Sequence, residues 1–276
     1  MTRGLSQINL KHPLDVISGD LLISRIEAHS FKSMPAAVEE EYDGWLLRLS
    51  KSKTKRINSV NFLKKPNGAL SLQEKITYCE SYYNKHHYPC RFRVTPLASP
   101  TSLENELSNK DYQPIDTTDV LVQNLANIEV TPASNTVSVE IKATQEWLET
   151  ICTLTGRHSE EEKKSLKDIL DRIEIETCFA SIQIDGKIVA CGLATFDDGI
   201  MGLFEIATSP NHQRKGLGRD LINQLLNLAI KRGVKIAYLQ VVQSNQIGRL
   251  FWNSMGFSDR LYGYQYWIQP HPKESI

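Results

Sequence analysis

The chain has 276 residues, of which 41% are hydrophobic and 23% charged, and since domains cluster near roughly 100–150 residues we expect two of them. The 32 basic and 32 acidic side chains balance, so no net charge would draw nucleic acid or an anionic membrane surface to the chain. Scattered cysteines without metal-ligand spacing, and the lack of a long apolar run, exclude a metal site and a membrane span, and a cytoplasmic protein is expected.

The first half of the chain carries a mixed pattern. Residues 1–19 show little periodicity and are left irregular. Further elements are predicted as strands at 42–50, 56–63 and 91–96, and as helices at 71–85 and 102–108. The pattern changes near 121–132, and small polar residues at 133–136 suit a loop. We therefore place the boundary near 124–128, which gives domains 1–125 and 126–276.

The second half has a clearer order. Helices are predicted at 144–155 and 159–173, and the second begins with Ser159 and Glu162 at capping-box spacing. Asp185 and Gly186 join strands 178–184 and 189–196 in a hairpin. The remaining elements are strands at 200–208, 235–242 and 262–268 and helices at 217–232 and 246–255. The predicted class is therefore an α/β fold with a mixed sheet, in the order α-α-β-β-β-α-β-α-β.

A glycine-rich basic loop lies where the strand at 200–208 turns into a helix. It reads Thr208-Ser209-Pro210-Asn211-His212-Gln213-Arg214-Lys215-Gly216-Leu217-Gly218. The first amides of a helix are unpaired and lie at the positive end of its dipole, and glycine lets the backbone approach an anion closely. The pattern therefore favours a phosphate-binding loop, although it is neither a dinucleotide fingerprint nor a Walker loop.

This loop resembles that of the GCN5-related N-acetyltransferases, whose pattern is Gln/Arg-x-x-Gly-x-Gly/Ala after a strand and a proline. The resemblance continues to Met255-Gly256-Phe257 and covers about half of the chain. It implies the acetyltransferase fold in the second half and acetyl-coenzyme A as the cofactor. It also implies that the backbone of Ile206, Ala207 and Thr208 pairs with the pantetheine arm. The pyrophosphate would bind the amides of Gln213, Arg214, Lys215, Gly216, Leu217 and Gly218, and the thioester end would contact Asn245 and Trp252.

The chain departs from this pattern where proton transfer is expected. The second half looks most similar to the N-terminal acetyltransferases of the superfamily, which use a Glu as base and a Tyr as acid. Gln240 and Trp252 stand at those positions, and neither side chain exchanges protons near pH 7. Glu205 is our substitute base, with a solvent-facing strand carboxylate as the alternative. For the acid we choose Tyr264 from Tyr262, Tyr264 and Tyr266, which share one strand face and could equally serve packing.

The first half resembles a faded copy of the second. Gly44-Trp45-Leu46-Leu47-Arg48 and Asn58-Ser59-Val60 are similar to strands in the first domain of tandem bacterial members of the superfamily. The corresponding loop, 64–71, lacks the glycine pattern, so a degenerate domain that walls the acceptor cleft is expected there. Trp45, Arg48, Arg56 and Asn58 either face that cleft or serve packing and surface charge.

The function implied is an N-acetyltransferase that transfers acetyl from acetyl-coenzyme A directly to a primary amine of a small molecule or peptide. Two alternatives stay open at this point. The chain could bind the cofactor as a regulatory module without turnover, or it could bind an unrelated phosphate ligand. The expected partner is the amine acceptor, with no nucleic acid or membrane, and the sequence leaves the oligomeric state open.

Overall fold

The computed structural model describes residues 19–63, 68, 70–98, 100, 102–126 and 128–269. The elements of the first half are α1 (Gly19–Ser33), β1 (Val38–Tyr42), β2 (Trp45–Leu49), the 3-10 turn η1 (Lys55–Ile57), β3 (Ser59–Phe62), α2 (Leu72–Lys85), β4 (Arg91–Val94), α3 (Leu103–Asn109) and β5 (Gln113–Asn124). Those of the second half are β6 (Ser138–Glu140), α4 (Gln145–Leu154), α5 (Glu160–Asp171), β7 (Glu176–Ile184), β8 (Lys187–Asp197), β9 (Ile200–Thr208), η2 (Pro210–His212), α6 (Leu217–Lys231), β10 (Ile236–Val242), α7 (Gln246–Ser254) and β11 (Asp259–Ile268).

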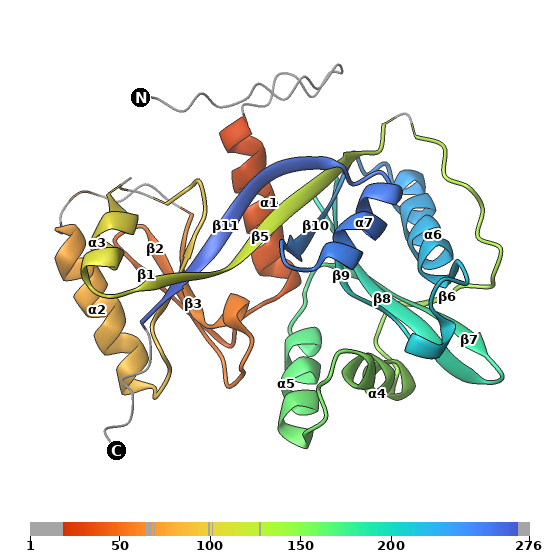
Figure 1. Ribbon diagram of the computed structural model, residues 1–276, viewed down its shortest axis with the longest axis horizontal. Helices are drawn as coiled ribbons and strands as arrows, with labels where there is room; N and C mark the ends of the chain where they lie inside the picture. Colours follow the sequence, from red (N-terminus) through yellow and green to blue (C-terminus); the bar gives the residue numbers. More distant parts are fainter. Residues whose placement is uncertain are drawn as a thin grey trace.

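All of these strands join one mixed sheet of eleven strands, in the order β1-β2-β3-β4-β11-β5-β10-β9-β8-β7-β6 (Figure 1). The antiparallel pair of β5 and β11 lies near the centre, with four strands on one side and five on the other. On either side of that pair the next strand, β4 or β10, is antiparallel to its central neighbour and parallel to the strand beyond. The last strand of each half therefore lies beside strands of the other half.

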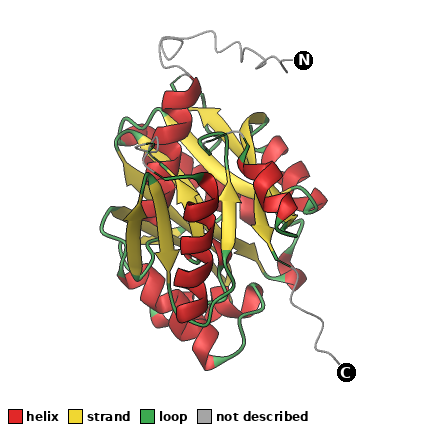
Figure 2. Cartoon of the chain, turned by 90° about the vertical axis from the view of Figure 1, so that its left-hand side faces the viewer, coloured by secondary structure: helices red, strands yellow, loops and turns green. Residues whose placement is uncertain are grey.

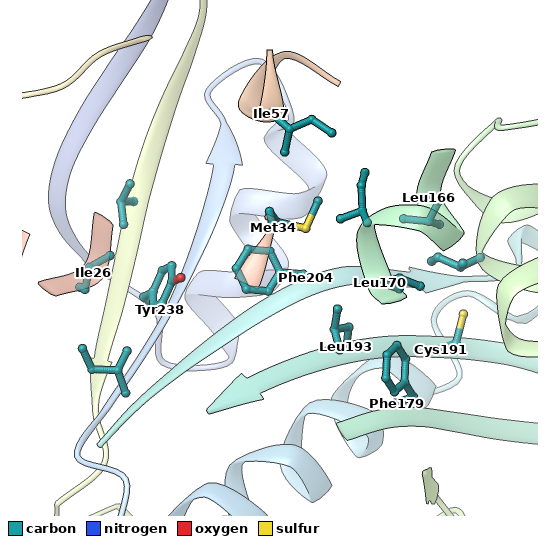
Figure 3. Close-up of a cluster of buried hydrophobic side chains, with 14 of the residues drawn as sticks. Ile26, Met34, Ile57, Leu166, Leu170, Phe179, Cys191, Leu193, Phe204 and Tyr238 are labelled. Atoms are coloured by element: carbon teal, nitrogen blue, oxygen red, sulfur yellow. The ribbon is translucent and has the colours of Figure 1, made fainter. Parts of the chain in front are cut away.

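Helices cover both faces of the sheet (Figure 2). On one face, α1, α4 and α5 bury their apolar side chains against the central strands and β7 to β9. The other face is covered by α6 and α7 in the second half and by α2 and α3 in the first. Figure 3 shows the first of these clusters, which contains Ile26, Met34 and Ile57 of the first half and Leu166 and Phe204 of the second. The first of the three clusters therefore joins side chains of both halves.

The helix α1 was not predicted, although it lies over the centre of the sheet (Figure 1). Its face toward the strands is polar as well as apolar. Glu27 is buried and accepts a hydrogen bond of 2.9 Å from Arg93 of β4, which is also fully buried. The hydroxyl of Tyr262 on β11 donates to the same carboxylate. Because charged side chains are rare in a core helix, an amphipathic pattern alone does not reveal this one.

Several predicted elements of the first half are corrected by the structure. The single strand predicted at 42–50 is wrong, because Asp43 and Gly44 have φ of 44° and 81° and turn the chain into a hairpin of β1 and β2. Such a pair of left-handed residues forms the tight turn that suits twisted strands. The short strand β6 precedes α4, so the second half does not begin with two helices.

Other predictions are confirmed. Ser159 and Glu162 form the capping box of α5, and Asp185 and Gly186 have the positive φ values of a tight hairpin turn between β7 and β8. All five cysteines are free thiols, and four of them are buried. Within the described ranges, no helix combines the length and the apolar character that crossing a membrane requires.

His29 on α1 couples stability to pH. Burial is the main cause that lowers its pKa to about 4, and its Nδ1 lies 3.0 Å from the Tyr238 hydroxyl. Since the unfolded chain binds this proton near pH 6.5 and the folded one does not, stability is lost as pH falls from 6.5 toward 4. We expect a loss of about 3 kcal/mol in the free energy of unfolding, from a shift of this size.

Urea unfolding at pH 7 and pH 4.5 measures this loss. In His29→Leu the difference between the two pH values should shrink by most of that amount, because no proton then binds the unfolded chain at this position. His158→Gln, at an exposed histidine, is the matched control and should leave the difference unchanged. A His29→Leu protein with the wild-type pH dependence would contradict the prediction.

Candidate active site

The strands β9 and β10 separate at the centre of the second half. Their paired register ends at Leu203 and Leu239. Beyond that point Glu205 takes φ of 49°, and the β8–β9 ladder shifts register between Cys191 and Leu193. A bulge of this kind bends a strand away from its neighbour. The following segment keeps its pairing to β8 alone, and its other edge faces the gap toward β10.

The predicted pantetheine contacts lie on this free edge. Ala207 pairs with Cys191 and Thr208 with Ala190, so their side toward β10 has no strand partner in the register of the described residues. Ile206 packs against the cluster under α6. Backbone amides and carbonyls on an unpaired strand edge bind an extended chain in the way another strand would. The sequence expectation for these three positions is therefore compatible with their placement.

The glycine-rich loop forms the N-terminus of α6. Gly216 is the N-cap, with φ of 83°, and the first backbone bond inside the helix runs from the Asp220 amide to the Gly216 carbonyl. The amides of Leu217 and Gly218 therefore have no partner within the helix. A Cβ on Gly218 would lie 3.4 Å from the Phe251 ring, which is ordinary contact. Gln213, Arg214 and Lys215 are exposed before this helix start, so the loop presents amides and cations where an anion is stabilised.

The segment before β6 is attached to this helix start. The carboxylate of Asp220 accepts hydrogen bonds from the backbone amide of Asn135 at 3.0 Å and from its side-chain amide at 2.6 Å. Burial raises the pKa of Asp220, but these hydrogen bonds outweigh it and lower the pKa below its ordinary value. The charged carboxylate in the first turn stabilises α6 and fixes the loop geometry.

The remaining predicted cofactor residues lie on α7. Asn245 is exposed and caps that helix, because its side-chain oxygen accepts a hydrogen bond of 2.9 Å from the Gly248 amide. Trp252 is buried between the rings of Phe251 and Phe257. Its indole contributes to the core below α6, while Phe251 is the α7 residue that contacts Gly218.

A cleft of about 270 Å³ lies between the two halves of the chain, on the face of the sheet that α1, α4 and α5 cover. The predicted base and acid, Glu205 and Tyr264, both line it, together with Gln240. The first half contributes the β2–β3 connection and the start of β5. The other lining residues are Met34, Thr54, Lys55, Arg56, Asp116, Thr118, Arg157, Val242 and Tyr266.

Glu205 does not face bulk solvent, so the alternative of a solvated carboxylate is wrong. Its side chain is only 10% exposed and forms a two-pronged ion pair with Arg157, at 2.6 Å and 3.1 Å. Burial lowers the pKa of Arg157, but the Glu205 charge outweighs this and the net shift is upward. The bulge at Glu205 thus aims a held carboxylate into the cleft.

Tyr264 is held by Gln240. The phenol donates a hydrogen bond of 2.8 Å to the Gln240 side-chain oxygen, and the Gln240 nitrogen donates to the Ser30 hydroxyl at 2.9 Å. Burial would raise the pKa of Tyr264, yet the guanidinium groups of Arg93 and Arg56 outweigh it and lower the pKa. The Arg93 group stacks 3.8 Å from the phenol ring centre. By contrast, burial and the neighbouring Tyr264 raise the pKa of Tyr266.

The first half contributes fewer cleft residues than the sequence allows. Trp45 packs against Phe62 and Phe92 in the core below α2, so its packing interpretation is confirmed. Arg48 is fully buried and bonds to backbone carbonyls and to Glu39. Asn58 is also buried and bonds within the β2–β3 connection. Arg56 alone of the four lines the cleft, and residues 64–67 and 69 of the first-half loop lie outside the described chain.

Sequence reasoning missed Arg157 and Ser30. Arg157 follows α4, and it meets Glu205 across 48 positions of sequence. Ser30 lies on α1 and meets Gln240 across 210 positions. A single sequence carries no local signal for such distant partners. Gln240 on β10 reaches Tyr264 on β11 across one intervening strand. That strand is β5 of the first half, so the sequence of the second half alone does not predict this contact.

The family model described as "Probable histone acetyltransferase Rv0428c C-terminal" matches residues 22–266. The chain belongs to this family. One relative, the "Uncharacterized N-acetyltransferase YobR" of Bacillus subtilis, is 28% identical over 240 residues, which are 86% of this chain and 94% of the relative. A "[Ribosomal protein bS18]-alanine N-acetyltransferase" of Escherichia coli is 36% identical over 75 residues, 27% of this chain and 51% of that protein.

Solved structures agree on the fold. A GCN5-related N-acetyltransferase from Kribbella flavida superposes with a TM-score of 0.65 at 15% identity, over 91% of this chain and 96% of the other. The chain therefore shares the fold of this GCN5-related N-acetyltransferase. The protein is therefore an enzyme that uses acetyl-coenzyme A to acetylate an amine.

Proposed function

We propose that the protein transfers acetyl from acetyl-coenzyme A directly to a primary amine of a small molecule or peptide that enters the cleft between the two halves. The observation that carries this proposal is the cleft itself. It brings Glu205, at the point where β9 leaves β10, to the same cavity as Tyr264. The glycine-rich loop follows the end of β9 and leads into α6. A pantetheine arm that extends from this loop along β9 would therefore place its thioester near Glu205 and Tyr264.

The proposed acetyl transfer includes two proton transfers. The acceptor nitrogen attacks the thioester carbonyl, and Glu205 takes the proton that the nitrogen loses, directly or through a water molecule. The carbon–sulfur bond then breaks, and the Tyr264 hydroxyl protonates the leaving thiolate. Backbone amides at the β9 bulge stabilise the oxyanion between these events. No covalent enzyme intermediate is required.

We further infer that the first half, residues 1–125, is a degenerate copy of the acetyltransferase fold and that residues 126–276 form the catalytic copy. The order from β1 to β5, strand-strand-strand-helix-strand-helix-strand, repeats from β7 to β11, and the pairing directions repeat with it. The second half has β6 and a second helix in addition. The last strand of each copy, β5 or β11, is inserted beside strands of the other copy. Each copy is therefore complete only with a strand of the other. In this arrangement the first copy supplies one wall of the acceptor cleft through η1 and β5.

Glu205→Gln tests the role of the base. The substitution keeps the shape of the side chain but removes its ability to accept the proton, so we expect kcat/KM for the amine to fall roughly 10- to 100-fold at neutral pH. At higher pH, where more of the amine is neutral, the deficit should narrow. Release of coenzyme A, followed over a panel of amino acids, polyamines and short peptides, measures this.

Arg157→Lys is the companion variant, because it retains a cation beside Glu205 but not the two-pronged geometry. A smaller loss is expected there. A wild-type protein that binds acetyl-coenzyme A but releases no coenzyme A with any amine would instead favour a binding module without turnover. Equal activity of wild type and Glu205→Gln would remove Glu205 from the chemistry.

A further inference from the structure

We propose that the acceptor carries a carboxylate close to its amine and that Arg56 binds this carboxylate in the cleft. This inference rests on the proposed function, since it names the class of substrate for the same cavity. The contact with a substrate carboxylate adds to the effect of Arg56 on the pKa of Tyr264, which Arg93 shares. The argument has three parts, which are the charge balance of the cleft, the surroundings of Arg56, and the size of the cavity.

The charges that line the cleft do not cancel. It contains three cationic side chains and two carboxylates. Arg157 is paired with Glu205, and Lys55 forms an ion pair with Asp116. Arg56 has no carboxylate partner among the described residues, so the cleft carries one uncompensated positive charge. A guanidinium stays protonated in proteins, and a cation in a partly buried site without a partner is unfavourable until an anion joins it.

The backbone around Arg56 is fixed. The residue lies in η1, and its carbonyl accepts a hydrogen bond of 3.1 Å from the buried Arg48 side chain. Its guanidinium lies 5.7 Å from the centre of the Phe204 ring, one residue before Glu205. The Nε atom is buried and has no hydrogen-bond partner within the described part of the chain. A planar guanidinium with an unused donor matches the two oxygens of a carboxylate.

The position of Arg56 relative to the reacting groups sets the kind of acceptor. Arg56, Glu205 and Tyr264 line one cavity of about 270 Å³. This is below the common range of roughly 300–1,000 Å³ for small-molecule pockets. A cavity of this size holds a carboxylate and an amine of one small molecule, or of one residue at the end of a peptide. A polyamine, which would place a second cation beside Arg56, is disfavoured.

Matched pairs of acceptors test this class. The standard amino acids with a primary amine and their carboxamides share a side chain and an α-amine and differ in the charged group. Because the carboxamide also lowers the pKa of that amine, rates are compared per concentration of neutral amine. With wild type we expect kcat/KM for the acids to exceed that for their amides by about tenfold or more, the range of one charge-assisted hydrogen-bond pair. In Arg56→Met the preference should disappear, and in Arg56→Lys it should be intermediate. The ratio within one variant cancels any general loss of activity.

Arg172→Met is the control variant. The Nε of Arg172 is also buried without a partner in the described chain, but this residue does not line the cleft. Its substitution should leave the acid-to-amide ratio at the wild-type value. Amides accepted as well as acids by wild type, or a ratio unchanged in Arg56→Met, would overturn the proposal.

A binding measurement makes the test independent of which amine reacts. In protein labelled with ¹⁵N and saturated with coenzyme A, the Nε–H resonance of Arg56 is assigned by its loss in Arg56→Lys. Titration with acetate should move this resonance saturably, and acetamide should not. An Arg56 resonance that acetate leaves in place would refute the carboxylate site. If wild type binds no acetyl-coenzyme A in a calorimeter, the proposed function itself fails, which is a separate outcome.

Discussion

Replacing Tyr264 by phenylalanine is expected to lower kcat by about 10²–10³-fold, within the range that general acid catalysis contributes. In our proposal the phenol protonates the leaving thiolate in the cleft, and the Gln240 side-chain oxygen accepts its hydrogen bond at 2.8 Å. The substitution removes one oxygen from a buried ring and leaves its packing in place. Affinity for acetyl-coenzyme A should stay close to wild type, since the cofactor loop is untouched.

The pH profile distinguishes a proton donor from a packing residue. A general acid acts only while protonated, so wild-type kcat should fall as pH rises through the pKa of Tyr264. Although burial opposes it, Arg93 and Arg56 lower this pKa, so the fall begins at lower pH than a free phenol would give. In Tyr264→Phe this alkaline decline should vanish along with most of the activity.

Tyr266→Phe is the matched control for this prediction. Tyr266 lies on the same strand and lines the same cleft, but burial and the neighbouring Tyr264 raise its pKa. Its loss should change kcat only slightly and preserve the alkaline decline. If Tyr266→Phe loses activity as strongly as Tyr264→Phe, the tyrosines act through packing and the assignment of the acid to Tyr264 is wrong.

Gln240 illustrates how the site differs from the two-residue scheme that the motif implies. An amide at this position cannot accept a proton, yet it connects Ser30 of α1 to the phenol of Tyr264. In our proposal the proton-transfer groups lie on two other strands. Glu205 lies on β9 and Tyr264 on β11, with β10 and β5 between these strands in the sheet. In this proposal Gln240 acts through Tyr264 and is a positioning residue.

Local features of the second half could be predicted because their causes are local. The hairpin at Asp185 and Gly186, the cap at Ser159 and the glycine at the start of α6 each depend on a few consecutive residues. The same holds for the cofactor loop, whose chemistry follows from a helix N-terminus. The resemblance of this loop to the family pattern can therefore be recognised from a single sequence.

The cleft could not be predicted, because its walls come from distant parts of the chain. The β5–β11 pair joins residues such as Val120 and Tyr262, and the pairing decides which half each strand completes. Helix α1 was not predicted because its buried face includes Glu27 and His29, which a hydrophobic pattern assigns to the surface. Arg56 was identified only as one of four candidates, since burial and charge pairing are properties of the folded chain.

Gly218→Glu is expected to weaken acetyl-coenzyme A binding by more than about 100-fold. The new carboxylate would project from the first turn of α6, where unpaired amides and Arg214 and Lys215 favour a pyrophosphate, and like charges at such short range repel strongly. Gly218 is a better test position than Gly216, because Gly216 has φ of 83° and any side chain there strains the backbone. Calorimetric titration of the purified protein measures the affinity.

Gly218→Ala separates charge from bulk. Its Cβ would make ordinary contact with the Phe251 ring at 3.4 Å, so the fold should accept it and the affinity should fall only a few-fold. The two variants have the same backbone requirement, and the glutamate adds the charge and the length that reach the phosphate position. Comparable binding in Gly218→Glu and wild type would place the pyrophosphate away from α6. In that case the pantetheine arm would not start beside the free edge of β9. The orientation proposed for the thioester in the cleft would then be wrong.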